Sequence, residues 1–267
     1  MFYQIQRDFL ITGIGYYNDR VFSKGHNFKG ERHDFTEIVY VHAGSVQVVE
    51  TENVYILTSG DLLIHAPMEF HCIKSYGGTE PHVYNISVTT EGRLPPQLFA
   101  GVFHLDRQMQ AEFLSCGEMT RQLLSDKQHM SHDGQRTAEN LTAFLLALCS
   151  WKAHTQANAT DGSAQIYRRL VKDMQAAVCM DLTLAQIAAQ GFVSISYLKQ
   201  LFRQYANTTP KRFYDELRIK HAVTQLKEGK AVTEIAESMG FSSPNFFATF
   251  FKRQMGMTPS AYKKSIR

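Results

Sequence analysis

Residues 232–259, VTEIAESMGFSSPNFFATFFKRQMGMTP, repeat the pattern of residues 184–210, LAQIAAQGFVSISYLKQLFRQYANTTP. Leu184, Ile187 and Ala188 recur about 48 positions later as Val232, Ile235 and Ala236, and Phe202, Thr209 and Pro210 recur 49 positions later as Phe251, Thr258 and Pro259. Each copy combines a short apolar helix, a tight turn and a second amphipathic helix, which is the pattern of a helix-turn-helix. The repeat predicts two tandem units whose second helices can each enter a DNA major groove.

The second helix of the first copy follows a serine cap at Ser194 or Ser196 and carries one apolar and one polar face. Helical spacing places Tyr197, Leu198, Leu201 and Phe202 on the inner face. The outer face then carries Ser196, Lys199, Gln200, Arg203 and Gln204. These side chains supply the donors and acceptors that base edges and phosphates require, so we expect them to bind DNA.

The second copy has its own candidate recognition helix after Ser242 or Ser243, with Pro244 in its first turn. We expect Phe246, Phe247, Phe250 and Phe251 to pack inward and the DNA-binding face to carry Asn245, Ala248, Thr249, Lys252 and Arg253. Because this outer face has shorter side chains than the first, fewer base hydrogen bonds are expected. Lys252 and Arg253 would then mainly position the DNA backbone.

Other helices complete the carboxyl-terminal region. The pattern predicts helices over residues 166–180, 184–190 and 232–239, and a long helix from Lys211 to about Glu228 that spaces the two units. Gly240 supplies a left-handed turn residue in the second unit. In the first unit that turn position holds Phe192, with Gly191 one place earlier, so the sequence alone does not fix the geometry of this turn.

Charge divides the chain in the same way. Residues 166–267 hold sixteen Lys and Arg against seven Asp and Glu, a net charge of +9, whereas residues 1–165 hold twelve against eighteen, a net charge of −6. Phosphate neutralisation supplies most of the sequence-independent affinity for DNA. The asymmetry indicates a basic DNA-binding domain fused to a domain of another kind.

Length and composition set the outer bounds. A chain of 267 residues suits two domains, each large enough to bury its own core. No run of eighteen apolar residues and no signal-peptide profile are visible, so we expect a cytoplasmic protein without membrane contact. Cys72, Cys116, Cys149 and Cys179 form no C-x-x-C pair, which argues against a zinc or redox motif and favours reduced, mostly buried thiols.

The amino-terminal part, residues 1–104, is expected to be all-β. Short runs rich in β-branched and aromatic residues occur at 38–41, 46–49, 54–57 and 62–64, separated by turn signals. Strands at this spacing favour a barrel or sandwich, and a small barrel has room for one small ligand.

Residues 105–153 change to helical spacing after Pro95-Pro96. Two alternatives remain open for this helical pair: it packs against the barrel, or it forms the dimer contact, since it carries more apolar surface than packing on one side needs. Residues 154–165 are polar and aperiodic and are interpreted as the interdomain linker before the DNA-binding domain, residues 166–267.

The carboxyl-terminal region resembles the AraC/XylS family of bacterial transcription regulators. The second unit matches that family's signature through Ile235-Ala236, Gly240-Phe241, Phe246-Phe247, Phe251-Lys252-Arg253, Gly256, Thr258-Pro259 and Tyr262. The first unit matches through Ile187-Ala188, Ser194, Ser196-Tyr197-Leu198 and Phe202. The resemblance implies a regulator, expected to be an activator that works with RNA polymerase and forms a homodimer.

The amino-terminal half resembles the cupin-type effector-binding domain of that family through His33-Asp34-Phe35, Glu37, Gly44, Gly60-Asp61-Leu62-Leu63-Ile64, Pro67 and His71. The resemblance implies a small-molecule effector, often a sugar, held in the barrel. As effector-binding residues we expect His33, Glu37, Tyr40, His71 and Tyr84, although core packing is the commoner role for the two tyrosines. His33, Glu37, His65 and His71 also permit a metal site, but a single histidine stands where enzymatic relatives place a His-x-His pair.

No Ser-His-Asp arrangement, phosphate-binding glycine loop or paired acid motif stands out. The chain is therefore expected to be a sequence-specific DNA-binding regulator without catalytic residues, cofactor or metal. Two alternatives stay open: a metal-dependent cupin enzyme with a basic appendage, and a constitutive regulator whose barrel serves only for dimerisation.

Overall fold

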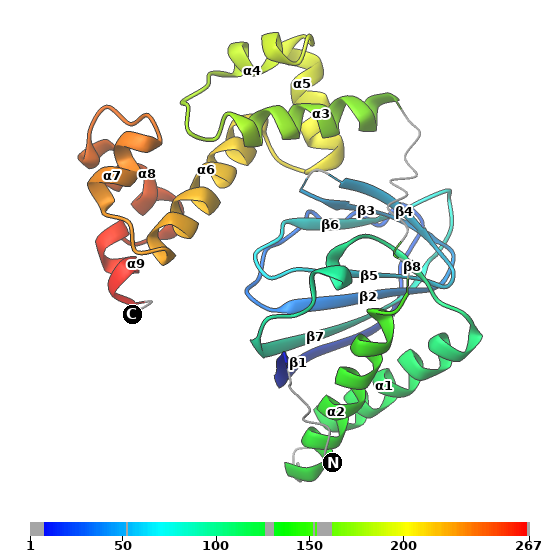
Figure 1. Ribbon diagram of the computed structural model, residues 1–267. Coiled ribbons are helices and arrows are strands. Elements are labelled where there is room, and N and C mark those ends of the chain that lie inside the picture. Colours follow the sequence, from blue (N-terminus) through cyan, green and yellow to red (C-terminus); the bar gives the residue numbers. More distant parts are fainter. Residues whose placement is uncertain (1–7, 52, 126–130, 152, 154–161, 266–267) are drawn as a thin grey trace. The chain divides into compact units, whose positions relative to one another are not determined.

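The structure is a computed structural model that describes residues 8–51, 53–125, 131–151, 153 and 162–265. The chain divides into two compact units, Met1–Thr160 and Asp161–Arg267. The first is rich in strands and the second consists of helices (Figure 1). This architecture confirms the predicted fold class.

The first unit contains two antiparallel sheets. Its strands are β1 (Phe9–Val21), β2 (Thr36–Ala43), β3 (Ser45–Glu50), β4 (Asn53–Thr58), β5 (Asp61–His65), β6 (His71–Ser75), β7 (His82–Gly92) and β8 (Phe103–His104), with a 3-10 turn at Pro96–Phe99. In the described part of the chain one sheet has the order β1-β7-β2-β5-β8 and the other β4-β3-β6. The four apolar runs recognised in the sequence correspond to β2, β3, β4 and β5.

The all-β prediction for residues 1–104 covers the long strands β1 and β7, but no apolar run marks their bounds in the sequence. Strand β1 includes two glycines and several polar residues, so it lacks the uninterrupted β-branched pattern that marks β2 to β5. It pairs antiparallel with β7 along its whole length, with register shifts after Ile11 and Ile14. Pairing with a neighbour, rather than local propensity, therefore makes this segment a strand.

Two apolar cores lie on opposite faces of the five-stranded sheet. Between the sheets, a cluster includes Val39, Val41, Val48 and Leu57. On the outer face, Ile38 and Ile64 belong to a second cluster that also includes side chains of the two helices that cover it. These helices are α1 (Arg107–Ser125) and α2 (Ser131–Leu148), and they lie along β1 and β7 in Figure 1. The helical pair therefore packs against the sheet.

The second unit contains the helices α3 (Gly162–Ala176), α4 (Leu184–Gln190), α5 (Ile195–Tyr205), α6 (Pro210–Lys227), α7 (Val232–Ser238), α8 (Pro244–Met255) and α9 (Pro259–Ser265). Helix α3 begins four residues before the predicted start at Ile166. The last four residues of the expected linker thus belong to α3, and residues 154–161 lie outside the described residues. Gly162, Ser163 and Gln165 hid this first turn, because a single buried alanine, Ala164, gives too little apolar periodicity to mark a helix.

Helix α6 contributes to two separate cores in the second unit. Near its start, the Phe213 ring lies 5.1 Å from the ring of Phe202 on α5, centroid to centroid. Further along, Ile219, Ala222 and Leu226 join a cluster with residues of α7 and α8. Each helix-turn-helix therefore packs on a different part of α6.

Among the described helices, none has the length and apolar character needed to cross a membrane. None of the four cysteines forms a disulfide.

Candidate functional site

Helix α5 presents one polar face, the first part of a candidate DNA interface. Its N-terminus is capped by Ser194, whose Oγ accepts a hydrogen bond from the backbone N–H of Tyr197 at 3.1 Å. The stripe of Leu198, Leu201, Phe202 and Tyr205 is buried. On the opposite face, all five residues expected to bind DNA are exposed: Ser196, Lys199, Gln200, Arg203 and Gln204. This face gathers hydroxyl, amide, ammonium and guanidinium groups within about two turns, which suits base edges and phosphates.

Helix α8 presents the corresponding polar face in the second helix-turn-helix. Ser243 caps it by accepting a hydrogen bond from the backbone N–H of Phe246 at 3.3 Å, and Pro244 occupies the first turn. Of the residues expected on the DNA-binding face, Asn245, Thr249, Lys252 and Arg253 are exposed and Ala248 is half-buried. The Thr249 hydroxyl donates to the backbone oxygen of Asn245 at 2.9 Å. The two recognition helices thus differ in reach, because α8 offers long side chains only in its last turn.

The position of Phe246 differs from the core predicted for the second helix-turn-helix. The prediction that it packs inward was wrong, since this side chain is 66% exposed while Phe247 and Phe251 are fully buried. The reason lies in the turn before α8. The ring of Phe241 lies 5.3 Å, centroid to centroid, from both Phe247 and Phe250. It packs on this side of α8, and Phe246 stays in solvent beside Asn245.

The two helix-turn-helix turns use different residues for the same backbone conformation. Gly240 has a φ of +69° and Phe192, at the equivalent position, has a φ of +52°. Gly191 is needed for another reason, because a Cβ there would lie 2.1 Å from Cδ2 of Leu170 on α3. Close packing of α4 against α3 therefore fixes the glycine at 191, and the left-handed conformation falls on phenylalanine.

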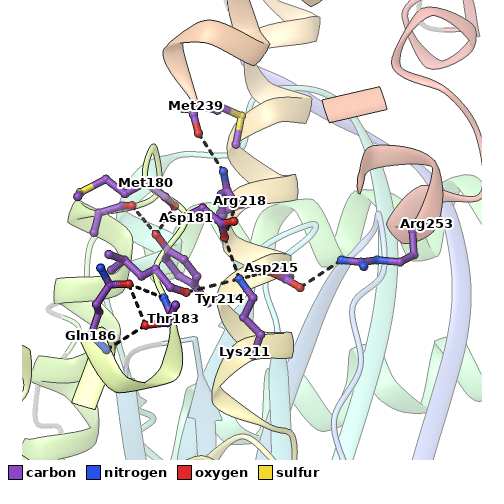
Figure 2. Close-up of polar contacts among 12 residues, drawn as sticks. Met180, Asp181, Thr183, Gln186, Lys211, Tyr214, Asp215, Arg218, Met239 and Arg253 are labelled. Atoms are coloured by element: carbon purple, nitrogen blue, oxygen red, sulfur yellow. Dashed lines mark hydrogen bonds and ion pairs between the residues drawn. The ribbon is translucent and has the colours of Figure 1, made fainter. Parts of the chain in front are cut away.

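A set of polar contacts, named here the α6 network, joins α6 to both helix-turn-helix units. It comprises Asp181, Lys211, Asp215, Arg218, Met239 and Arg253 (Figure 2). Arg218 Nη1 lies 3.2 Å from Oδ1 of Asp181, in the segment before α4, and its Nη2 donates to the backbone oxygen of Met239 at 2.9 Å. Met239 is the C-cap of α7. One buried guanidinium thus contacts both units.

Asp215 forms the other half of the α6 network. This carboxylate is buried, and it lies 3.3 Å from Nζ of Lys211 and 3.6 Å from Nη2 of Arg253. Lys211 also donates to Asp181 at 3.0 Å, and this hydrogen bond is the main reason that the pKa of Asp181 is lowered. Arg253 therefore belongs both to the exposed face of α8 and to the contact between α8 and α6 (Figure 2).

Sequence reasoning missed Arg218, although a signal was present. Tyr214, Arg218 and Ala222 follow one another at helical spacing and all are buried. A charged residue within such a stripe needs partners, since an isolated buried charge is very costly. The arginine at position 218 could therefore have been recognised as a contact residue.

In the β-rich unit, Met1–Thr160, a group named here the inter-sheet polar cluster lies beside the apolar core between the two sheets. Its members are His33, Glu37, Glu50, His65, His71, Asn85 and Ser87. His71 Nε2 lies 3.2 Å from Oε2 of Glu37, and His65 Nδ1 lies 2.6 Å from Oε1 of Glu50. The rings of His65 and His71 stack at a centroid distance of 4.0 Å.

Charge within this cluster is set by competition between burial and pairing. Burial alone would raise the pKa of Glu37, but the hydrogen bond from His71 and the charges of His65 and His71 lower it to about 2. Burial would lower the pKa of His71, yet pairing with Glu37 raises it. The pKa of His33 is lowered, mainly by burial. The result is a carboxylate that stays ionised throughout the neutral range.

Several polar atoms of the inter-sheet polar cluster make no hydrogen bond within the described part of the chain. Among the described residues, Nε2 of His33, Oδ1 of Asn85 and Oγ of Ser87 are buried without a hydrogen bond. Buried polar atoms normally find a partner, and leaving one unsatisfied costs about 1–3 kcal/mol. Three such atoms near one carboxylate therefore suit a polar ligand.

The five expected effector-binding residues fall into two groups. His33, Glu37 and His71 lie together in the inter-sheet polar cluster. Tyr40 and Tyr84 lie on the opposite face of the sheet, where Tyr40 Oη donates to Oε1 of Gln110 on α1 at 3.1 Å. Strand alternation causes the separation, because Glu37 and Tyr40 are an odd number of positions apart on β2.

A groove of about 880 Å³ runs along β1 and the two helices that cover the sheet. One wall is formed by residues 8–14, and the other includes Leu123, Ala138 and Leu146. Sequence patterns did not indicate this groove, since it depends on strand β1, which no apolar run marks.

Comparisons with known proteins agree with both halves of this description. A family model described as AraC-like ligand binding domain matches residues 22–149, and one described as Helix-turn-helix domain matches residues 175–265. The HTH-type transcriptional activator RhaR of Shigella dysenteriae is 25% identical over 88% of this chain and 87% of its own length.

Two solved structures are also similar. ToxT from Vibrio cholerae is 13% identical and aligns with 98% of this chain and 99% of its own, with a TM-score of 0.38. A transcriptional regulator from Chromobacterium violaceum, described by its AraC-type DNA-binding domain, is 30% identical. It aligns with 39% of this chain and 95% of its own, with a TM-score of 0.36.

Proposed function

This chain belongs to the AraC/XylS family of transcription regulators, and we propose that it activates transcription when a small polar molecule binds in its β unit. The carboxyl-terminal unit is a DNA-binding domain, and the amino-terminal unit is a ligand-binding domain. Activation is proposed because the curated relatives that match most of the chain are described as transcriptional activators. Such a regulator acts in the cytoplasm, where DNA and RNA polymerase are present.

For DNA binding, the proposal assigns different tasks to the two recognition helices. Lys199 and Gln200 of α5 would contact base edges, with Ser196, Arg203 and Gln204 beside them. Asn245 and Thr249 of α8 would make fewer base contacts, and Lys252 and Arg253 would bind phosphates. The exposed side-chain sets of the two helices support this division, since reach and donor number are greater on α5.

For effector binding, the single observation that carries the proposal is the set of unsatisfied buried atoms beside Glu37. A carboxylate accepts hydrogen bonds from hydroxyl groups, and imidazole and amide groups supply both donors and acceptors. The chemistry of His33, Glu37, His71 and Asn85 therefore suits a hydroxyl-rich molecule, such as a carbohydrate. Tyr40 and Tyr84 are not included, because both lie on the other face of the sheet.

The proposed mechanism requires the effector to favour one arrangement of the DNA-binding units. A ligand shifts an equilibrium only by the difference between its affinities for the two states. We propose a homodimer whose two DNA-binding units are repositioned in this way, through the helical pair of residues 105–153. Exposed Leu124 and Leu146 on that pair support an apolar contact between protomers.

The test uses the purified full chain and a duplex that the protein itself selects from a random library. Affinity is measured at two salt concentrations, with and without candidate sugars. We expect specific binding that weakens steeply with salt, and a sugar that changes the affinity or the DNase footprint. If no sugar does so, effector sensing is rejected while DNA binding stands, and the constitutive regulator becomes the better description.

Variants locate the effector site. Glu37→Gln keeps the shape of the side chain and removes its charge, so we expect at least a tenfold higher sugar concentration for the same response. Tyr84→Phe is the matched control, because Tyr84 lies on the opposite face of the same sheet. An equal loss of response in both variants would reject the inter-sheet polar cluster as the effector site.

A metal-dependent enzyme of the cupin type is the second candidate, and one observation favours it. Glu37, His65 and His71 each offer a ligand atom, and these atoms lie within 4.8 Å of one another. Imidazole nitrogen and carboxylate oxygen are common ligands of iron, manganese and zinc. Stoichiometric metal in the purified full chain, lost in His71→Ala, would favour this function over sugar binding.

A further inference from the structure

Arg218 is a side chain of α6 that contacts both helix-turn-helix units. Its side chain is 1% exposed. On one side it reaches Asp181, which precedes α4, and on the other the backbone oxygen of Met239, which ends α7. Figure 2 shows the guanidinium between these two partners.

Aromatic rings of the second helix-turn-helix complete the environment of Arg218. Its guanidinium carbon lies 4.4 Å from the ring centroid of Phe241 and 5.4 Å from that of Phe250. Attraction between a cation and an aromatic face strengthens when water is excluded. The planar guanidinium also fixes the directions of its hydrogen bonds, which an ammonium group cannot do.

The two helix-turn-helix units make their apolar contacts with α6 at different ends of this helix. The first helix-turn-helix packs on the Phe213 end of α6, and the second helix-turn-helix packs on the Ile219 to Leu226 end. Between these ends, the contacts of Arg218 depend on both units at once. Rotating either unit about α6 would leave a buried guanidinium without a partner, which is strongly unfavourable.

We infer that Arg218 is a positioning residue that fixes the spacing and rotation of the two recognition helices, so that the protein accepts bipartite DNA sites of one spacing only. This inference rests on the proposed DNA binding by α5 and α8. One inserted base pair moves the second half-site by about 3.4 Å and rotates it by about 36°. A rigid pair of helices cannot follow such a change, whereas a loosened pair can.

The experiment measures the affinity of the full chain for a set of duplexes. One duplex carries the selected bipartite site, two carry one base pair inserted or deleted between the half-sites, and one carries only the half-site bound by α5. The wild type should bind the changed spacings at least tenfold more weakly than the selected site. Arg218→Gln should bind the selected site about tenfold more weakly than the wild type, discriminate spacing by only about twofold to threefold, and retain its affinity for the single half-site.

Two further variants keep the test decisive. Asp181→Asn changes the exposed partner of Arg218 and should fold even if Arg218→Gln does not; we expect it to discriminate spacing less than the wild type. Arg212→Gln is the matched control, since Arg212 is exposed and pairs with Glu216 on the same helix. This variant should discriminate spacing as the wild type does.

The positioning role of Arg218 and the proposed DNA binding would be overturned by different results. Unchanged spacing discrimination in folded Arg218→Gln and in Asp181→Asn would reject the positioning role. So would an equal loss of affinity for the bipartite site and the single half-site, since this indicates a general structural role. If the wild type binds no selected duplex at all, the proposed DNA binding fails instead.

Discussion

Phe192 carries an unusual combination of a left-handed backbone and a side chain that is 90% exposed. A residue other than glycine in this region stores about 1–3 kcal/mol of strain. The ring gains nothing from burial that would offset this cost. Strain at this turn therefore lowers the stability of the first helix-turn-helix.

Replacing Phe192 by glycine should stabilise the helical carboxyl-terminal unit by about 1 kcal/mol. The relieved strain exceeds the roughly 0.5–1 kcal/mol that glycine costs through unfolded-state entropy. Urea unfolding followed by helical circular dichroism measures the change as a higher midpoint at constant slope. Phe192→Ala is the control, since it removes the exposed ring and keeps the Cβ. Equal gains in both variants would show that the ring, and not the backbone, is responsible.

Glu37 and His71 give the β unit a pH-dependent stability. The pKa of His71 is raised above 6.5, so its contribution is complete below pH 6.5 and is lost as pH rises through the folded pKa. The pKa of Glu37 is lowered from 4.5 to about 2, so its contribution is present above pH 4.5 and is lost as pH falls toward 2. The pair therefore stabilises the fold most between about pH 4.5 and 6.5.

Histidine ring NMR of the full chain tests this assignment. We expect the titration midpoint of His71 to lie above 6.5 and that of His33 below it, because only His71 is paired closely with Glu37. Glu37→Gln should move the His71 midpoint down. A midpoint of His71 that does not respond to this substitution would contradict the pairing.

At the scale of elements, the two recognition helices should respond differently to loss of one charged side chain. Lys199→Ala on α5 should cost about 1–3 kcal/mol at the selected site and relax the preference at a few base positions. Arg253→Ala on α8 should weaken binding to all sequences alike and flatten the salt dependence, as expected for a phosphate contact. Affinity measured on matched and mismatched duplexes at two salt concentrations distinguishes them. If Lys199→Ala leaves both affinity and preference intact, α5 is not the base-reading helix.

Elements with a strong local pattern could be predicted from the sequence, and elements made by tertiary pairing could not. Strands β2 to β5 carry continuous apolar runs, whereas β1 becomes a strand through its register with β7. The apolar face of α8 could be recognised, but helical spacing does not distinguish Phe246 from Phe250. Only the position of Phe241 decides which ring is buried. By contrast, strand alternation could have separated Glu37 from Tyr40, which were predicted together as effector-binding residues.

For the whole molecule, the division of charge matches the division into units. The second unit is basic and carries the exposed faces of α5 and α8, while the first unit is acidic and keeps its ionised Glu37 buried. Sequence composition was enough to predict this division. The α6 network was missed because it depends on contacts between segments more than twenty residues apart, such as that of Arg218 with the backbone oxygen of Met239.

The sharing of α6 between two cores limits how this architecture can change during evolution. Although the repeat suggests that a single helix-turn-helix was once duplicated, neither copy could now be excised as an independent module. A chain cut after Pro210 would lose the ring of Phe213 from the first core, and a fragment starting at Val232 would lose Ile219, Ala222 and Leu226 from the second. We therefore expect evolution to keep, exchange or lose the two copies together.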